Sequence, residues 1–297
     1  MSFPYLSDAL RAITGVNLPL PLPMFGLFVG LAVVVASICL KHEIRRLYAT
    51  GKIGLATIRG GEANGSALMH PEATVTDLAF VTIMTGIVGA RLFHILENLD
   101  QFILDPWGMI FTRSGLSIFG GLILGTMAGL ICVRRWKLPL RPMLDAAAPA
   151  MMLGYAIGRV GCQVSGDGDW GTVANMVIKP NWLPTWLWAQ TYENNVVGIF
   201  IPAPGVYPTP LYEVVMSLAC FAILWCVRKH PFQAGWLFSM YLLFAGIERM
   251  LIEQIRINPV LSFAGLHATQ AEFISIAIML LGLAGLVLFG HRAKSKK

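Results

Sequence analysis

The sequence predicts an all-α polytopic membrane protein with about seven transmembrane helices, and three observations support this. Of its 297 residues, 56% are hydrophobic and only 13% are charged, whereas roughly a quarter of the residues in soluble domains are charged. Apolar windows of about 20 residues, the length that crosses a bilayer core, recur along the whole chain. No stretch between them is long enough for a soluble domain, so we expect one integral membrane domain over residues 1–297.

The predicted elements follow one another from end to end. The spans cover roughly 22–40, 75–96, 116–133, 143–163, 209–227, 234–253 and 270–290. Before them, residues 1–20 are expected to form an interfacial arm, because Leu6, Leu10 and Ile13 share one face of a short helix. Residues 164–208 form a loop region rich in Gly, Pro, Trp and Asn, and loops of that length are usually functional or disordered.

The distribution of basic residues predicts the orientation. Clusters follow the first, third and fifth spans and end the chain, with members Lys41, Arg45, Arg46, Lys52, Arg59, Arg134, Arg135, Lys137, Arg141, Arg228, Lys229, Arg292, Lys294, Lys296 and Lys297. All fall on one side, which the positive-inside rule makes cytoplasmic. The N-terminus and the 164–208 loop region are therefore expected outside and the C-terminus inside. Because the net charge of +6 resides in these clusters, no nucleic-acid partner is expected.

The cysteines and the N-terminus exclude several classes of protein. The five cysteines, Cys39, Cys132, Cys162, Cys220 and Cys226, include no CxxC pair. We therefore expect no disulfide framework, no metal site and no cofactor. No basic region precedes the first apolar run, so no cleaved signal peptide is expected. The absence of matching halves disfavours a transporter.

Three arginines lie within or at the outer ends of apolar spans, namely Arg91, Arg159 and Arg249. An arginine at a helix centre costs about 2.5–3.5 kcal/mol on insertion scales, so all three should face partners or a wet cavity. Helical spacing places them on polar stripes with, respectively, His94 and Asn98, Tyr155 and Cys162, and Glu253 and Arg256. Two interpretations stay open. The arginines either bind a phosphate bidentately at the outer leaflet, or pair with Glu97, Glu213, Glu248 and Glu253 and lock the bundle.

Residues that could take part in binding or catalysis are most concentrated in the segment 158–171. Its sequence is Gly-Arg-Val-Gly-Cys-Gln-Val-Ser-Gly-Asp-Gly-Asp-Trp-Gly. Its glycines at 166, 168 and 171 permit positive φ and the close approach of a ligand. Asp167 and Asp169 follow Arg159 across this turn. Alone, the pattern also fits an ordinary helix stop, and its aspartate spacing fits no EF-hand.

This turn resembles the signature of the prolipoprotein diacylglyceryl transferase family, Gly-Arg-x-Gly-Asn-Phe-x-Asn-Gly-Glu followed by Trp-Gly. Further matches are similar in order and spacing. Residues 115–121 resemble the family's Gly-Met-Ser-Phe-His-Gly-Gly, residues 145–149 its Asp-x-x-x-Pro, and residues 207–213 its His-Pro-Ser-Gln-Leu-Tyr-Glu. Arg249, Glu253 and Arg256 resemble its Arg-x-x-x-Glu-x-x-Arg. The resemblance runs from about residue 80 to the C-terminus.

The resemblance implies a seven-helix enzyme of the bacterial cytoplasmic (inner) membrane. Such an enzyme moves diacylglyceryl from phosphatidylglycerol to the lipobox cysteine of a preprolipoprotein and releases glycerol phosphate on the outer side. The expected partners are thus phosphatidylglycerol, the preprolipoprotein signal peptide and membrane lipid, and we expect a monomer. The expected catalytic residues are Arg159, Arg249, Asp167, Asp169 and Glu253. The expected substrate-binding residues are Arg91, His94, Gly120, Gly121, Cys162, Ser165, Gly166, Gly171, Tyr212, Glu213 and Arg256.

The sequence also departs from the family pattern. Phe119 stands where the family has the histidine assigned to thiol activation, and a phenyl ring cannot move a proton. Cys162 and Ser165 replace the two signature asparagines, and Tyr207 replaces a histidine. The thiol base is therefore open among Asp167, Asp169, Glu253 and His94, with His267 a weaker candidate. The alternative functions are a phospholipid-binding pseudoenzyme, a paralogue with another acceptor, and a lipid or anion transporter.

Overall fold

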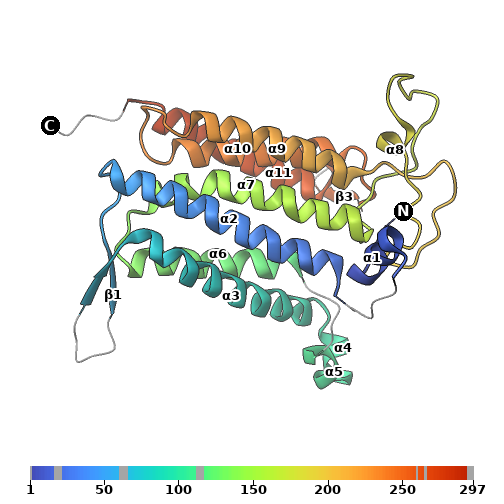
Figure 1. The fold of residues 1–297 in the computed structure, drawn as a ribbon, viewed down its shortest axis with the longest axis horizontal. Coiled ribbons are helices and arrows are strands. Elements are labelled where there is room, and N and C mark those ends of the chain that lie inside the picture. Colours follow the sequence, from blue (N-terminus) through green and yellow to red (C-terminus); the bar gives the residue numbers. More distant parts are fainter. Residues whose placement is uncertain are drawn as a thin grey trace. The chain divides into compact units, whose positions relative to one another are not determined.

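The computed structural model describes residues 2–16, 22–59, 66–111, 117–258, 260–263 and 266–292 (Figure 1). Within these ranges the chain is mostly helical, with two short hairpins, which confirms the predicted all-α class. Some positions that carry sequence predictions lie outside the described residues: positions 115 and 116 of the 115–121 segment, and the C-terminal lysines Lys294, Lys296 and Lys297.

In the described ranges, seven helices of 18 residues or more fall on the seven predicted spans. They are α2 (Met24–Ala49), α3 (Thr74–Glu97), α6 (Ile118–Arg135), α7 (Leu140–Ser165), α9 (Thr209–Val227), α10 (Trp236–Glu253) and α11 (Gln270–Phe289). Five of them, α2, α3, α6, α9 and α11, are long and apolar enough to cross a membrane. The remaining two, α7 and α10, have the length and carry the charged candidate residues Arg159, Arg249 and Glu253. The protein is a multi-pass membrane protein.

Shorter elements connect the long helices. The predicted N-terminal helix is present as α1 (Leu6–Thr14), where Asp8 accepts the Tyr5 N–H at 3.0 Å and caps the first turn. The other short elements were not predicted from the sequence. They are a 3₁₀ turn at Pro71–Ala73, the helices α4 (Leu99–Leu104), α5 (Pro106–Phe111) and α8 (Thr185–Trp188), and the antiparallel hairpins β1–β2 (Ala56–Arg59 with Ser66–Met69) and β3–β4 (Val260–Phe263 with Leu266–Thr269).

The chain divides into two compact units. Unit 1 comprises Met1–Ala36 and Ala147–Lys297, and unit 2 comprises Ser37–Ala146. The boundaries fall inside α2 and α7. A single membrane domain over residues 1–297 stays a prediction.

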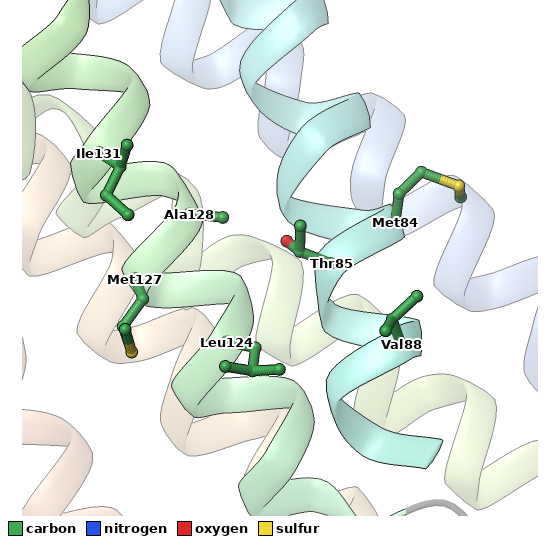
Figure 2. Close-up of a pocket in the computed structure, with 7 residues that line it drawn as sticks. All are labelled: Met84, Thr85, Val88, Leu124, Met127, Ala128 and Ile131. Carbon is green, nitrogen blue, oxygen red and sulfur yellow. The ribbon is translucent and has the colours of Figure 1, made fainter. Parts of the chain in front are cut away.

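Unit 2 is built on a close contact between α3 and α6. A Cβ added to Gly120 would lie 2.2 Å from the Gly89 carbonyl oxygen, and one added to Gly89 would lie 2.4 Å from the Gly120 carbonyl oxygen. Small residues allow helix backbones to approach in this way inside a membrane. An apolar hollow of about 350 Å³ lies between the two helices, lined by Met84, Thr85, Val88, Leu124, Met127, Ala128 and Ile131 (Figure 2).

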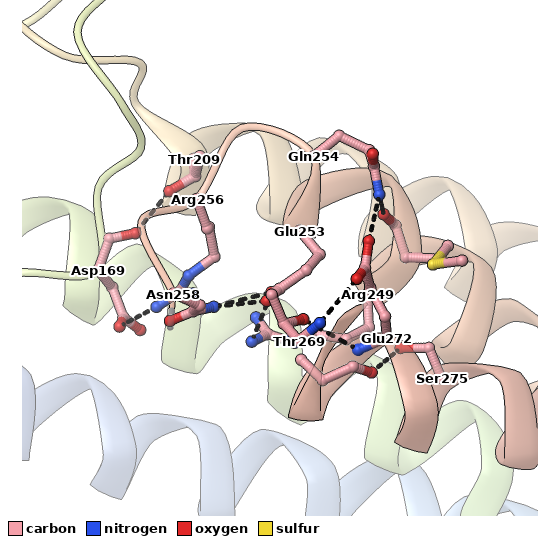
Figure 3. Close-up of polar contacts among 12 residues, drawn as sticks. Asp169, Thr209, Arg249, Glu253, Gln254, Arg256, Asn258, Thr269, Glu272 and Ser275 are labelled. Atoms are coloured by element: carbon pink, nitrogen blue, oxygen red, sulfur yellow. Dashed lines mark hydrogen bonds and ion pairs between the residues drawn. The ribbon is translucent and has the colours of Figure 1, made fainter. Parts of the chain in front are cut away.

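In unit 1, four long helices meet at one end of the unit. Ala148, Met152, Leu224 and Leu237 form a buried apolar cluster among α7, α9 and α10. Beyond it, the end of α7, the start of α9, the end of α10 and the start of α11 meet through polar contacts (Figure 3). The N-terminal segment joins this end, because the Phe3 N–H donates to the Val164 carbonyl at 2.7 Å and the Ser2 N–H to the Glu193 carbonyl at 2.9 Å.

The 164–208 loop region is ordered around two small cores of its own. Tyr192, Ile201 and Val206 are buried and pack with Trp170, and Ala174, Ala189 and Tyr207 are buried and pack with Trp188. Isolated β-bridges join Val206 to both Val173 and Gln190. The loop tryptophans therefore fall into two groups, packed and exposed. Trp170 and Trp188 pack inside the loop, whereas Trp182 and Trp186 are 81% and 60% exposed, as expected of an interfacial belt.

Candidate active site

Arg159, near the end of α7, is the centre of the polar contacts in unit 1. Its side chain is 13% exposed, and its Nε lies 3.0 Å from the Tyr155 hydroxyl and 3.1 Å from a Glu213 carboxylate oxygen. Its Nη1 approaches the Cys162 sulfur at 3.7 Å and forms an ion pair with Asp169. Glu213 comes from α9, is fully buried, and also accepts the Tyr155 hydroxyl at 2.8 Å. The predicted stripe of Tyr155, Arg159 and Cys162 therefore exists and has a buried counter-ion.

Asp169 joins two guanidiniums. Its carboxylate forms an ion pair with Arg159. It also accepts Arg256 Nη2 at 2.6 Å, and the Thr209 hydroxyl donates to the main-chain carbonyl of Asp169 (Figure 3). Burial pushes the pKa of Asp169 upward, but the charges of Arg159 and Arg256 outweigh that effect, and the pKa lies below its ordinary value. Asp169 is therefore ionised at neutral pH and is a weak base. Its geometry suits holding the two arginines together.

A second ion pair lies on α10. Arg249 Nη2 contacts Glu253 at 3.0 Å, one helical turn away, and the Asn258 side chain donates to both Glu253 carboxylate oxygens at 2.7 and 2.9 Å (Figure 3). Glu253 is 5% exposed, whereas the Arg249 side chain is 30% exposed and is thus more accessible than Arg159 or Arg256. Because a guanidinium has five N–H donors, a carboxylate partner leaves donors for a second anion.

The glycine-punctuated turn after α7 has the backbone predicted for it. Gly166 and Gly168 have φ of +63° and +96°. A Cβ on Gly171 would lie 2.5 Å from the Ile255 carbonyl oxygen, so the close approach there is to the chain itself. Ser165 is 1% exposed, and its hydroxyl donates to the Cys162 carbonyl at 3.4 Å. These contacts shape the end of α7.

Asp167 differs from the other site carboxylates. It accepts the Asp169 N–H at 3.2 Å, and within the described residues no arginine contacts it. Donor atoms of Cys162, Asp167 and Asp169 lie within 4.8 Å of one another, close enough to hold a metal ion. The two guanidiniums already bound to Asp169 oppose a cation at this position.

The other predicted site residues of unit 1 act as supports. The Tyr212 hydroxyl donates to the Leu187 carbonyl at 2.7 Å and ties α9 to α8. Asn258 and Thr209 contribute to the site, although neither was predicted as a site residue. Asn258 lies beyond the end of α10, and Thr209 acts through a loop carbonyl, so helical spacing carried no signal for either.

Four predicted substrate-binding residues lie in unit 2. Arg91 on α3 donates to the Met109 carbonyl at 3.3 Å, and the carbonyl of His94 accepts the Asn98 side chain at 2.9 Å. Gly120 and Gly121 pack against the α3 backbone. These four residues belong to a different unit from Arg159, and their place in the site stays a prediction.

The fold and the site define a multi-pass membrane protein whose buried arginines, braced by carboxylates at the helix ends, suit an anionic group carried on a lipid. Residues 13–288 match the sequence model of the family Prolipoprotein diacylglyceryl transferase. The chain belongs to this family, which confirms the resemblance predicted from the sequence.

Three relatives illustrate the extent of the similarity, and each is named phosphatidylglycerol–prolipoprotein diacylglyceryl transferase. The protein of Corynebacterium glutamicum is 31% identical over 212 residues, which are 67% of this chain and 64% of the relative. That of Bacillus cytotoxicus is 29% identical over 262 residues, covering 88% and 86%. That of Halalkalibacterium halodurans is 26% identical over 277 residues, covering 93% and 84%. The match thus spans less than two thirds of the first relative's length.

Proposed function

We propose that this protein transfers a diacylglyceryl group from phosphatidylglycerol to the cysteine thiol of a preprolipoprotein. Family membership supports the reaction class, and one structural observation carries the proposal. Arg159 and Arg256 converge on a single carboxylate, that of Asp169, at the helix ends of unit 1. A pair of guanidiniums arranged around one anion is the geometry that a phosphate ester requires.

The reaction follows from that geometry. The acceptor thiol gives up its proton, and its sulfur attacks the glyceryl carbon that carries the phosphate ester. A carbon–sulfur bond forms, the carbon–oxygen bond breaks, and the electron pair leaves with glycerol phosphate. Arg159 and Arg256 stabilise the developing phosphate charge, and we propose Arg249, whose side chain is more exposed, as a third cation for the same role. Binding of the phosphate competes with the carboxylates that hold these guanidiniums in the free protein.

We assign the thiol base to Asp167. An unperturbed thiol has a pKa of about 8.5, so a base or a positive field must favour the thiolate. Asp169 and Glu253 are occupied by arginines, and Phe119 cannot accept a proton. Asp167 lies beside the same turn, and no arginine in the described ranges contacts it.

We further propose that all seven long helices cross the bacterial inner membrane, with the site on the outer side. Contacts of Ser2 and Phe3 support this, because they attach the N-terminus to the site end of unit 1. The opposite end of that unit holds Arg228 and Arg292, where Gln233 also donates to the His291 carbonyl at 3.2 Å. Basic residues at that end favour the cytoplasm.

Cysteine labelling tests the sidedness. Val177→Cys in the 164–208 loop region and Leu68→Cys in β2, each on a background without native cysteines, replace side chains that are 92% and 68% exposed. In intact cells an impermeant reagent should label the first variant only. Labelling of the second would refute the orientation. Ser165, which is buried, is unsuitable for such labelling.

A peptide-mass measurement tests the activity. Purified protein is incubated with phosphatidylglycerol and a lipobox peptide, and a second peptide with serine in place of cysteine is the control. The cysteine peptide should gain one diacylglyceryl group with an equal amount of glycerol phosphate released, and the serine peptide should gain nothing. Lipid binding without any mass gain would favour the pseudoenzyme, which Phe119 motivates, and flux of lipid across vesicles without transfer would favour a transporter.

A further inference from the structure

An open hollow of about 470 Å³ lies in unit 1, beside the residues assigned to the reaction. It forms where the end of α7, the helix α8 with the residues after it, and the start of α9 come together, and it is lined by Gln163, Trp186, Ala189, Gln190, Thr191 and Leu211. These lining residues carry no formal charge. The proposed reaction has given none of them a role.

One wall of the hollow is a fixed chain of neutral hydrogen bonds. The Tyr192 hydroxyl donates to the Gln163 side chain, which donates to the Gln190 side chain, which donates to the Trp186 carbonyl, each at 2.8 Å. Each amide NH₂ has two N–H donors, and this chain uses one of each. A wall of this kind favours a neutral polar ligand, whereas a phosphate is better bound by the guanidiniums.

The same wall carries a strand edge. Gln190 forms an antiparallel bridge with Val206 through both main-chain hydrogen bonds, at 3.0 and 2.9 Å. In such a pairing the next residue directs its N–H and C=O to the opposite side. That residue is Thr191, and no hydrogen bond engages it within the described part of the chain. An extended peptide can add to an edge of this type through its main chain.

The hollow is also correctly placed for a reacting peptide. Gln163 lies four residues after Arg159 on α7, so the two side chains are neighbours on one helix face. Leu211 comes two residues before Glu213 on α9. Trp186, 60% exposed, offers an aromatic surface at the hollow. A peptide that runs along Thr191 therefore passes about one helical turn from the guanidinium that faces the phosphate.

We propose that this hollow is the subsite for the acceptor peptide. The peptide main chain pairs with the Thr191 edge, and an apolar side chain enters the hollow against Trp186 and Leu211. The inference rests on the proposed function only in taking the peptide to be the acceptor of the diacylglyceryl group. It assigns the two substrates to separate surfaces, the phosphate to the arginines and the peptide to the neutral wall.

Thr191→Trp tests the subsite by filling the hollow. We expect the KM for the lipobox peptide to rise at least about tenfold, because the indole blocks one or two main-chain hydrogen bonds between the peptide and the Thr191 edge. The KM for phosphatidylglycerol and the melting temperature should stay unchanged. Val196→Trp places the same side chain at a 51% exposed position of the same loop region, outside the hollow lining, and should change neither KM. An unchanged peptide KM in Thr191→Trp, or a rise in the lipid KM alone, would overturn the assignment.

A photoreactive phenylalanine analogue in place of Trp186 provides a readout that does not need turnover. Irradiation with the lipobox peptide should give a peptide adduct that excess unlabelled peptide suppresses and glycerol phosphate does not. Adducts with phosphatidylglycerol instead of peptide would show that the hollow holds lipid and would overturn the inference. If the peptide crosslinks but is never lipidated, the subsite stands and the proposed function fails.

Discussion

The arginine cluster of unit 1 and the α3–α6 contact of unit 2 are both places where helices approach closely, but the groups between the helices are opposite in character. Around Arg159 the space between helices is filled by charged side chains, each matched by a buried or half-buried carboxylate. At Gly89 and Gly120 the two backbones approach closely, and the side chains next to them are those of Phe93 and Leu124. Both regions carry motifs that resemble the family, yet one presents charged groups and the other presents backbone and apolar side chains.

The difference teaches that a family-like motif does not by itself identify chemistry. Within unit 1, the charged groups can exchange partners, because an incoming phosphate can replace a carboxylate at a guanidinium. The contact between Gly89 and Gly120 contains no charged group that could exchange partners. Substitutions in the first region should therefore change phospholipid binding or the rate of transfer, and those in the second should change stability at a constant rate per folded molecule.

The largest effect is expected from Arg159→Lys. An ammonium cannot replace the planar fork that reaches Glu213, Asp169 and an incoming phosphate together. Loss of one group that stabilises transition-state charge typically lowers kcat about 100-fold or more, and this is the loss we expect in the peptide-mass assay. Arg45→Lys is the matched control, because its ion pair with Glu72 is exposed and should contribute little. Equal rates for the two variants would remove Arg159 from the site.

Asp167→Asn and Asp169→Asn should separate the base from the bridge. The first removes basicity and keeps size, so we expect a rate loss of about 100-fold with an unchanged melting temperature. The second should weaken phospholipid binding and lower stability, because Arg159 and Arg256 lose their shared anion. If only Asp169→Asn abolished the pH dependence of the rate, Asp169 and not Asp167 would be the base.

Because the pKa of Asp169 is lowered in the folded protein, the effect of Asp169→Asn on the melting temperature should depend on pH. A carboxyl whose pKa is lower in the folded state stabilises the protein above its unfolded pKa of about 3.9 and loses that contribution as the pH falls through the folded value. The difference in melting temperature between the wild type and Asp169→Asn should therefore be full at neutral pH and shrink below about pH 4. A difference that does not vary with pH would contradict the ionised bridge.

Gly120→Ala should act on stability. Its Cβ would lie 2.2 Å from the Gly89 carbonyl oxygen, so α3 and α6 must separate, at a cost of about 1–3 kcal/mol. Gly30→Ala on α2 is the control, since no atom lies within 4 Å of its added Cβ. Thermal unfolding in detergent should show the loss for Gly120→Ala only, with normal transfer per folded molecule. A normal melting temperature with lost transfer would make Gly120 a substrate-binding residue, as the family resemblance implies.

Phe119→His is expected to have the smallest effect. It restores an imidazole that titrates near pH 6.5, but Asp167 already provides a base, so the rate should rise by less than about tenfold. The pH–rate profile should gain a step near that pH. A variant with an unchanged rate and profile would show that the histidine route plays no part in this protein.

The helices were predictable to a degree that the site contacts were not. Five of the long helices are apolar runs of nearly the length that a bilayer requires, and α7 and α10 are largely apolar runs with a few charged residues, so the hydrophobic pattern placed all seven ranges. The stripes on α7 and α10 followed from helical spacing, and the ion pairs of Arg159 with Glu213 and of Arg249 with Glu253 were among the partners foreseen. Contacts made by loops carry no periodicity, which is why the bridge from Asp169 to Arg256 and the support of Glu253 by Asn258 were missed. The hairpins were missed for a related reason, since each strand has only four residues.

Chemical rescue of Arg159→Ala tests the central claim most directly, because it separates the guanidinium from the rest of the fold. The variant should be folded and nearly inactive in the peptide-mass assay, and added guanidinium ion should restore transfer in a saturable manner, whereas ammonium at the same concentration should not. A folded variant that guanidinium fails to rescue, or that ammonium rescues equally, would contradict the claim that a guanidinium at this position stabilises the departing phosphate.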